Sequence, residues 1–415
     1  MRFYYLLILF ISNFLFAQTE LEGGIYSDKI LKKSESPYIV NSNLVVFPGI
    51  TVTVEPGVEV RFKNGVGLEV RGNFYALGSS ENRIKFTGVT KTIGSWNGFN
   101  FQGVDNSKSG FDFCDFEYAT YNYLMSNYSG SLYFKNSKFY KNLRAIAMFT
   151  SFEVPIDNCT FDSNDYGITS INKKVTNCTF INNKFGIAQV AYPISISNST
   201  FSNNIVAING YGITMDNSTI INNETGLDLV TNNVNYITNC NISNNSIGIS
   251  IGTSTTNNWE IKKNKICSNL NYNIKIASQN NVNLRENCWC TNDKSIIDNL
   301  IYDGYDNTNL GLVSYDIYED DCITKLASQE LDFKEKIEIY PNPSTSDFNI
   351  KIEKKAKKII LNIFSVDGKK VDTKYFENTD LMNYSSKNLS SGAYIINMDI
   401  DGKNFTKKIL KTNLK

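Results

Sequence analysis

The sequence predicts an all-β protein, in which a solenoid of short stacked strands is followed by a small antiparallel β-sandwich. One phrase of about 20 residues recurs seven times between Ser137 and Ile274, and self-similarity at that period is typical of a stacked array. One asparagine stands at the same place in every copy. After Ile337 this repeat stops, and the segments that follow alternate apolar with polar residues as antiparallel strands do.

The repeated phrase has the periodicity of strands. Successive copies are 22, 19, 21, 19, 22 and 24 residues apart. Apolar and polar residues alternate within each copy, whereas a helix would show an i, i+3, i+4 pattern. A unit this small cannot bury its apolar side alone, so neighbouring copies must stack. Each copy is marked by a large apolar residue, at Phe139, Phe161, Phe180, Phe201, Ile220, Ile242 and Ile266.

The recurring asparagine lies three residues after each large apolar residue. Its amide both donates and accepts hydrogen bonds, so we expect a ladder that runs through the rungs. Asparagine also tolerates the left-handed backbone of a sharp corner. The expected ladder is Asn142, Asn164, Asn183, Asn204, Asn223, Asn245 and Asn269. A small residue follows three positions later in six copies, and Asn273 breaks this spacing by one in the last.

This pattern resembles the right-handed parallel β-helix of the pectin-lyase-like superfamily, over residues 45–316. The strands around the Pro56-Gly57 turn resemble the first rungs of such helices, and Cys288-Trp289-Cys290 resembles their terminal segment. That segment usually carries glycine after the tryptophan, where Cys290 stands here. We expect residues 18–44 to form a lead-in. A leucine-rich repeat is excluded because its consensus is absent.

The first 17 residues are typical of a secretory signal peptide. Arg2 gives a positive start, 4–16 form an apolar run too short for a membrane span, and Ala17 offers a small residue for cleavage. No other segment is apolar enough to span a bilayer. We therefore expect passage through the periplasm, and no transmembrane span in the mature chain.

Residues 337–415 are expected to form a separate domain after a charged linker at 317–336. Alternating segments, among them 348–352, 360–364, 393–398 and 405–411, predict a β-sandwich of about seven strands. Motifs at 340–343, 366–371 and 389–394, with a basic last strand ending at Lys411, resemble the type A C-terminal sorting domain of the type IX secretion system of Bacteroidetes. The alternative is an ordinary adhesive β-sandwich.

The resemblance implies a secreted or outer-cell-surface protein and a partnership with the type IX secretion machinery. It also implies that the tail is removed and that the protein is either released or attached at the outer-membrane surface. The sorting-signal residues that it implies are Tyr340, Pro341, Asn342, Pro343, Gly368, Gly392 and Tyr394.

Six of the eight cysteines fall into two groups. Cys159, Cys178 and Cys240 stand two residues before the large apolar residue, where Ser137, Ser199 and Ser218 stand in other copies. This interchange predicts a small buried column rather than disulfides. By contrast, Cys288, Cys290 and Cys322 lie in the irregular end, where a disulfide is expected in an oxidising compartment.

The chain has no histidine, which excludes Ser-His-Asp and Cys-His nucleophiles and any zinc site that needs a His ligand. Lys+Arg equals Asp+Glu at 41 each, so no global charge favours nucleic acid. Two catalytic routes remain open: a pair of carboxylates, or calcium with an Arg or Lys base as in pectate lyases of this fold. The second needs clustered Asp near Arg144 or Arg285.

No catalytic set is recognisable, and no cofactor is expected other than calcium as the alternative. Asp157, Asp162 and Asp165 are close in sequence, but turn and surface roles explain them. Asp303 and Asp306 are candidate cation ligands, and turn formation is the competing explanation.

The leading hypothesis is a non-catalytic secreted or surface β-helix that binds glycan, such as extracellular polysaccharide, or other extracellular partners. Tyr121, Tyr123, Tyr128 and Tyr133 could stack on sugar rings, although tyrosine is also a good strand former. The alternatives are a polysaccharide lyase or glycoside hydrolase, and a purely structural stalk or adhesin. A cleft with two carboxylates roughly 5–10 Å apart would favour an enzyme.

Overall fold

The computed structural model describes residues 18–102, 107–124, 130–148, 154–169, 173–190, 194–229, 234–253, 259–316, 337–365, 370–387, 389–401 and 403–412. The chain divides into two compact units, residues 1–326 and 327–415. The expected signal peptide (1–17) and linker (317–336) lie outside the described residues.

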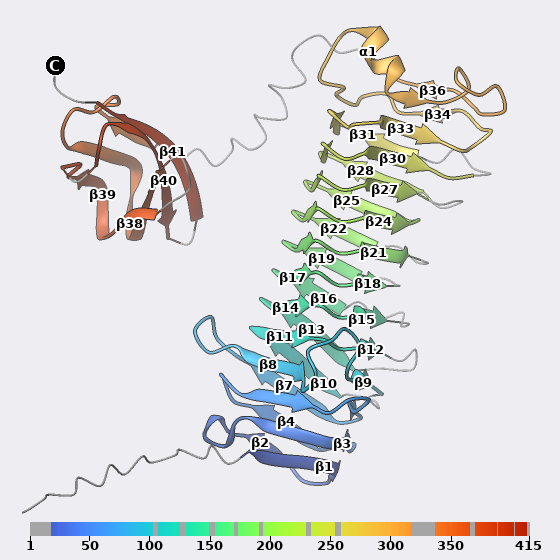
Figure 1. The fold of residues 1–415 in the computed structure, drawn as a ribbon, viewed down its shortest axis with the longest axis vertical. Coiled ribbons are helices and arrows are strands. Elements are labelled where there is room, and N and C mark those ends of the chain that lie inside the picture. Colours follow the sequence, from blue (N-terminus) through green and yellow to red (C-terminus); the bar gives the residue numbers. More distant parts are fainter. Residues whose placement is uncertain are drawn as a thin grey trace, which may run out of the picture. The chain divides into compact units, whose positions relative to one another are not determined.

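The first unit is a parallel β-solenoid, as the sequence predicts (Figure 1). It begins with β1 (Thr19–Ile25), β2 (Lys29–Leu31), the 3-10 helix η1 (Lys33–Glu35), β3 (Tyr38–Val46), β4 (Thr51–Val54), β5 (Glu59–Phe62), β6 (Gly67–Val70), β7 (Asn73–Leu77), β8 (Ile84–Gly88) and β9 (Gly98–Phe101). β1 pairs with β3, and β3 in turn pairs with both β5 and β6. Two faces of the solenoid are therefore joined into one 23-stranded sheet.

The repeated rungs have three strands each. The first strands belong to an 11-stranded sheet: β10 (Lys108–Asp112), β13 (Ser131–Lys135), β16 (Val154–Asp157), β19 (Lys173–Thr176), β22 (Ile194–Ser197), β25 (Ile213–Asp216), β28 (Asn235–Thr238) and β31 (Trp259–Lys262). The second strands are β11 (Cys114–Glu117), β14 (Lys138–Tyr140), β17 (Thr160–Asp162), β20 (Thr179–Ile181), β23 (Thr200–Ser202), β26 (Thr219–Ile221), β29 (Asn241–Ser243) and β32 (Lys265–Cys267). The third are β12 (Tyr121–Leu124), β15 (Arg144–Met148), β18 (Tyr166–Thr169), β21 (Phe185–Val190), β24 (Val206–Gly210), β27 (Thr225–Leu229), β30 (Ile247–Ile251) and β33 (Tyr272–Ile276).

The large apolar residues of the repeat form one column in the core. Their Cα atoms pair in register from strand to strand, starting with Phe139 against Phe161. The rings of Phe139, Phe161, Phe180 and Phe201 stack with centroids 4.8, 4.6 and 4.5 Å apart and nearly parallel planes. All four side chains are buried. The repeat period therefore places each large apolar residue on its equivalent in the next rung, as the spacing alone predicts.

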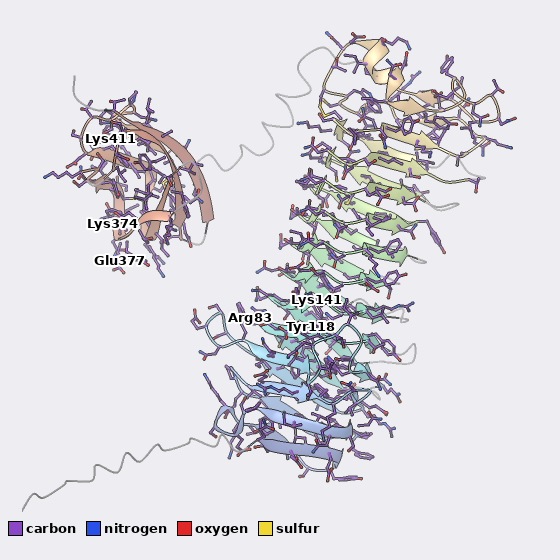
Figure 2. The ribbon with its side chains drawn as sticks, in the orientation of Figure 1. Arg83, Tyr118, Lys141, Lys374, Glu377 and Lys411 are labelled. Atoms are coloured by element: carbon purple, nitrogen blue, oxygen red, sulfur yellow. A yellow bond between two sulfur atoms is a disulfide. The ribbon has the colours of Figure 1, made fainter. Side chains whose placement is uncertain are left out.

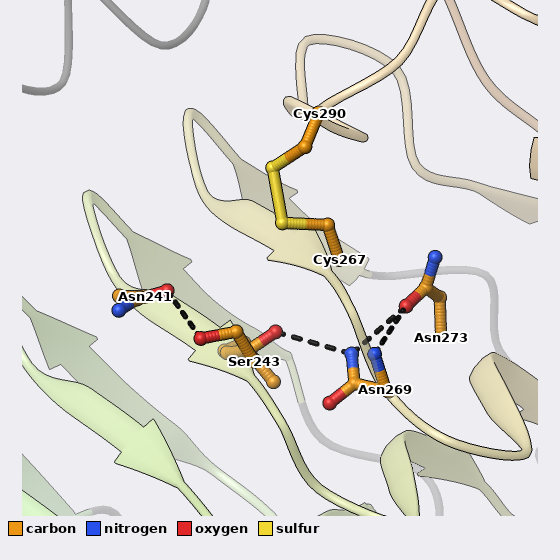
Figure 3. The surroundings of a disulfide bond; sticks show 7 residues. Asn241, Ser243, Cys267, Asn269, Asn273 and Cys290 are labelled. Atoms are coloured by element: carbon orange, nitrogen blue, oxygen red, sulfur yellow. Dashed lines mark hydrogen bonds between the residues drawn. A yellow bond between two sulfur atoms is a disulfide. The ribbon is translucent and has the colours of Figure 1, made fainter.

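The repeated asparagines form a continuous buried ladder. Asn183 Nδ2 donates to Asn204 Oδ1 at 2.9 Å, and Asn204 Nδ2 donates to Asn223 Oδ1 at 2.9 Å. Each ladder amide also donates to a backbone carbonyl of an adjacent rung, as Asn204 does to Phe180 O at 3.0 Å. At the last rung Asn269 Nδ2 donates to Asn273 Oδ1 at 2.9 Å (Figure 3). Asn273, which breaks the spacing of the repeat, thus supplies the final acceptor.

At the neighbouring corner, a second column of buried side chains accepts hydrogen bonds from backbone N–H groups. Its members are Ser137, Cys159, Cys178, Ser199, Ser218, Cys240, Asn264 and Asn287. Each acceptor takes the backbone N–H of the preceding rung, as Ser199 Oγ does from Cys178 N at 3.1 Å. The described cysteines of this column are free and buried, in agreement with the predicted small column. Asn264 and Asn287, which the repeat did not single out, close it.

We expect the free thiols of Cys114, Cys159, Cys178 and Cys240 to resist alkylation at pH 8 in the folded protein. Burial raises the pKa of Cys240 to about 12, and burial raises the pKa of Cys114 and Cys159 well above the usual thiol value. Because these folded-state pKa values are raised, their contribution to stability is complete below the unfolded pKa of about 8.5 and declines as pH rises above it. Mass spectrometry of alkylated peptides, before and after denaturation, measures this; labelling of the native thiols would contradict it.

The second unit is a five-stranded antiparallel sheet around its own core. Its strands are β37 (Glu338–Tyr340), β38 (Phe348–Ser365), β39 (Lys370–Tyr384), β40 (Gly392–Ile400) and β41 (Lys403–Lys411). Two strands predicted separately, 348–352 and 360–364, are one strand, β38. β38 pairs with β37 at its start and with β40 at its end, and its register with β39 shifts between Lys351 and Ala356. One strand therefore replaces two of those predicted, and the sheet of the described residues has five strands rather than about seven.

Candidate functional site

A hollow of about 700 Å³ opens in the C-terminal cap of the solenoid, after the last regular rung. The cap consists of β34 (Val282–Asn283), helix α1 (Lys294–Asn299), β35 (Ile301–Tyr302) and β36 (Val313–Ser314) (Figure 1). We call this hollow the cap cavity; it is lined by Arg285, Lys294, Asp298, Asn299, Ile301, Asp303, Tyr305, Asp306, Val313, Ser314 and Tyr315.

The cap is held to the last rung by covalent and polar contacts. A disulfide joins Cys267 of β32 to Cys290 (Figure 3). Cys290 has φ of +60°, so it adopts the left-handed conformation at the place where glycine is usual. Cys288 is also disulfide-bonded, and Cys322 lies outside the described residues. A disulfide in the irregular end was predicted, but Cys267 was not recognised as a partner because it stands in a regular strand.

One wall of the cap cavity is a hydrogen-bonded group formed by α1 and Tyr315, which directly follows β36. Lys294 Nζ donates to Asp298 Oδ2 at 2.6 Å, and the Tyr315 hydroxyl donates to Asp298 Oδ1. Partial burial opposes ionisation of Asp298, but the bonds from Lys294 and Tyr315 outweigh it and lower the pKa of this carboxyl. Burial and the bond to Asp298 raise the pKa of Tyr315. Asp298 is therefore an ionised acceptor at neutral pH.

A second wall is the turn built around Asp303. This buried carboxylate accepts backbone N–H groups from Tyr305 at 2.9 Å and Val313 at 2.8 Å, one on each oxygen. Asp306 Oδ2 in turn accepts from Asp303 N at 3.1 Å. Turn formation thus engages both carboxylate oxygens of Asp303 and one carboxylate oxygen of Asp306. The turn places Tyr305 at the rim of the cavity with 85% of its surface exposed.

The described residues contain no group of three or more His, Cys, Asp or Glu arranged to hold a metal ion. The calcium alternative therefore has no ligand cluster in the part of the chain that the structure describes. Arg285 lines the cap cavity, with its Nε 3.7 Å from Asp316 Oδ1. The same cavity is lined by Arg285, Asp298, Asp303 and Asp306. Aspartates beside an arginine are the arrangement that would favour the polysaccharide lyase or glycoside hydrolase.

The other sequence-predicted residues lie elsewhere. Asp157 accepts hydrogen bonds from Thr176 and Asn177. Asp162 accepts from Asn182 at 3.1 Å, and Asp165 forms an ion pair with Lys184 at 2.9 Å. These acidic side chains have the surface and turn roles that the sequence suggests.

The predicted tyrosines divide between packing and surface. Tyr133 lies over Gly110, where an added Cβ would meet its ring at 2.4 Å, so it is a packing residue. Tyr121 is 40% exposed, while Tyr128 and the side chain of Tyr123 lie outside the described residues. Sequence reasoning missed the cavity residues Lys294, Asp298, Asn299 and Tyr305; the i, i+4 spacing of Lys294 and Asp298 was the available signal.

In the second unit, the predicted sorting motif contacts the last strand. Asn342 Oδ1 accepts from Leu410 N at 2.9 Å, and Lys411 Nζ donates to Thr345 O at 2.6 Å (Figure 2 labels Lys411). The Tyr394 hydroxyl donates to Ser390 O at 2.9 Å. In the same motif Tyr340 ends β37, Pro341 and Pro343 lie between β37 and β38, and Gly392 begins β40. Gly368 lies outside the described residues.

No helix in the described part of the chain is long and apolar enough to cross a membrane. A segment covering 18% of the chain is 41% identical, over 75 residues, to Protein bark beetle of Drosophila melanogaster, and it spans 2% of the length of that protein. Residues 338–412 match the family model described as the secretion system C-terminal sorting domain. The tail of this chain is therefore a C-terminal sorting domain, and the chain is a secreted or cell-surface protein exported by type IX secretion.

Proposed function

We propose that the solenoid is a non-catalytic polysaccharide-binding module, and that the cap cavity holds a short stretch of sugar chain. The observation that carries the proposal is the exposed Tyr305 ring beside a cavity rich in hydrogen-bonding groups. Sugar-binding sites need an apolar face for the ring and polar groups for the hydroxyls, and tyrosine supplies a rigid apolar face. The resemblance to pectin-lyase-like helices also favours a polysaccharide partner.

The polar groups of the cavity suit sugar hydroxyls. Ionised Asp298 accepts hydrogen bonds, the Asn299 amide both donates and accepts, and Arg285 donates. Tyr315 is held by Asp298 and packs edge-on against Trp289, with ring centroids 5.6 Å apart. The walls are thus fixed by contacts within the cap, and a fixed site loses less conformational entropy when it binds.

A glycoside hydrolase or lyase is the second candidate, because three aspartates and Arg285 line one cavity. The environments of Asp298 and Asp303 favour binding instead. A general acid needs a raised pKa, whereas the bonds from Lys294 and Tyr315 lower the pKa of Asp298. Both Asp303 oxygens already accept backbone N–H groups. A stalk or adhesin role without a sugar ligand is the third candidate.

We expect Tyr305→Ala to weaken binding to a retained polysaccharide by about tenfold, because the loss of one stacked ring is worth about 1 kcal/mol or more. Affinity electrophoresis of the purified protein measures the change. The matched control is Tyr26→Ala, which removes a tyrosine that is 73% exposed at the other end of the solenoid. Equal losses in both variants would argue against the cap cavity. New chain ends that disappear in Asp298→Asn or Asp306→Asn would establish the enzyme instead.

A further inference from the structure

Aromatic and cationic side chains line one corner of the solenoid, far along the chain from the cap. This corner lies between the second and third strands of four successive rungs, β11–β12, β14–β15, β17–β18 and β20–β21. We call the following residues the corner strip: Tyr118, Tyr140, Lys141, Arg144, Tyr166 and Phe185 on its two sides, and Lys91 from the connection between β8 and β9 of the preceding rung. At a rung spacing of about 4.8 Å, four rungs extend about 14 Å along the solenoid axis.

On the first side of the corner strip, two neighbouring tyrosine rings are flanked by two lysines. Lys91 Nζ lies 5.6 Å from the centroid of the Tyr118 ring. The Tyr118 and Tyr140 rings meet edge-on, with centroids 6.1 Å apart. Lys141 Nζ lies 5.1 Å from the Tyr140 centroid. Figure 2 labels Tyr118 and Lys141 in this part of the solenoid. These cation–π contacts hold the positive groups next to the aromatic faces.

The second side continues the same arrangement on the third strands. Arg144, Tyr166 and Phe185 occupy equivalent outward positions, since their Cα atoms pair in register. The Arg144 guanidinium lies 5.4 Å from the Tyr166 centroid, and the Tyr166 and Phe185 rings stack at 5.1 Å with planes 4° apart. All three side chains are half-buried, so part of each faces solvent. The result is a stack of two rings with a guanidinium at one end, and the edges of these rings face solvent.

The strip has cations without matching carboxylates. In the described ranges, no Asp or Glu lies within ion-pair distance of Lys141 or Arg144. The nearby acids are engaged elsewhere: Asp165 pairs with Lys184, and Asp162 accepts from Ser163 and Asn182. Lys91 alone has a carboxylate, Glu117, at 3.9 Å. Two cations are therefore available to an anionic partner, although the chain as a whole has no net charge.

We propose that the corner strip is a second binding surface, which takes an anionic polysaccharide chain lying along the solenoid axis. Sugar rings would pack against the exposed edges of the Tyr140, Tyr166 and Phe185 rings, while sulfate or carboxylate groups pair with Lys141 and Arg144. Rings repeated at the rung spacing suit a polymer that itself repeats. The net charge of zero argues against nucleic acid, which binding proteins meet with a strong basic excess. This surface is separate from the cap cavity and goes beyond the function proposed above.

The test is retention of the mature exported protein on three gels, which contain dextran sulfate, polygalacturonate or neutral dextran. We expect retention on at least one anionic gel, weakening as salt is raised, and none on dextran. The double variant Lys141→Gln/Arg144→Gln should bind about tenfold more weakly, because two ion pairs are lost. Lys141→Arg/Arg144→Lys should retain binding. The better anionic gel identifies sulfate or carboxylate as the recognised group.

The matched control is Lys135→Gln/Lys174→Gln, which removes two exposed cations from the 11-stranded sheet. Its retention should equal that of the wild type. The proposal is overturned by equal losses in strip and control variants, by no retention on either anionic gel, or by tighter binding to DNA than to both polymers. Loss of anionic binding in Tyr305→Ala would assign it to the cap cavity and also overturn it. Failure of Tyr305→Ala to affect any sugar would contradict the cap cavity alone.

Discussion

Asn204→Ala is expected to lower the free energy of unfolding of the solenoid by roughly 3–5 kcal/mol, because several buried groups lose their partners at once. Asn204 Nδ2 donates to Phe180 O, Ser202 O and Asn223 Oδ1 at 3.0, 3.1 and 2.9 Å. Its Oδ1 accepts from Asn183 N and Asn183 Nδ2, each at 2.9 Å. The site is only 3% exposed, so water cannot replace these bonds.

The measurement is denaturant unfolding followed by the strand signal in circular dichroism. Asn203→Gly is the matched control, because Asn203 is the exposed neighbour and its φ of +56° suits glycine. We expect the control to change stability by less than about 0.5 kcal/mol. If the two variants unfolded at the same denaturant concentration, the ladder would not stabilise the corners as described.

Phe180→Ala is expected to cost about 3–5 kcal/mol, the usual range for deleting a buried phenylalanine. Its ring is fully buried and stacks on both sides, with Phe161 at 4.6 Å and Phe201 at 4.5 Å. The cavity left behind cannot close easily, since the rungs above and below are fixed by their backbone pairing. The same unfolding measurement applies.

Phe185→Ala is the control for this substitution. Phe185 lies five residues further on, points outward and is half-buried, so its loss should cost about 1 kcal/mol or less. A Phe185→Ala variant that is as unstable as Phe180→Ala would contradict the assignment of inward and outward positions. That assignment underlies both the core and the corner strip.

The regular part of the solenoid could be predicted because each rung obeys the same local rules. The spacing from Phe139 to Phe161 and from Asn142 to Asn164 is equal, so stacking one pair in register stacks the other. The exchange of Cys178 with Ser199 likewise indicated a small buried position, and both accept a backbone N–H there. A period thus carries three-dimensional information even without an alignment.

The cap cavity could not be predicted, because its residues follow no period. Asp298 and Tyr315 meet through a helix and a turn whose geometry depends on where Trp289 packs and on the disulfide between Cys267 and Cys290. Cys267 looked like an ordinary strand residue in sequence. Contacts between irregular segments depend on packing that spacing does not encode.

The corner strip could not be predicted from the sequence. The tyrosines predicted to stack on sugars, Tyr121, Tyr123, Tyr128 and Tyr133, are not part of it, and Tyr133 over Gly110 is a packing residue. Only the register of β15, β18 and β21 places Arg144, Tyr166 and Phe185 in one line.

The predicted number of strands in the sorting domain was wrong for a similar reason. The continuity of β38 depends on its pairing with β37, β39 and β40, which spacing does not encode.

The most direct test of the central claim uses the mature exported protein on a panel of neutral, sulfated and uronate polysaccharides. Retention and the appearance of new chain ends are scored together, with and without calcium. The account predicts retention of at least one polysaccharide, no new ends, and no dependence of either on calcium. New ends would make the protein an enzyme, and an absence of retention across the whole panel would contradict a polysaccharide-binding solenoid.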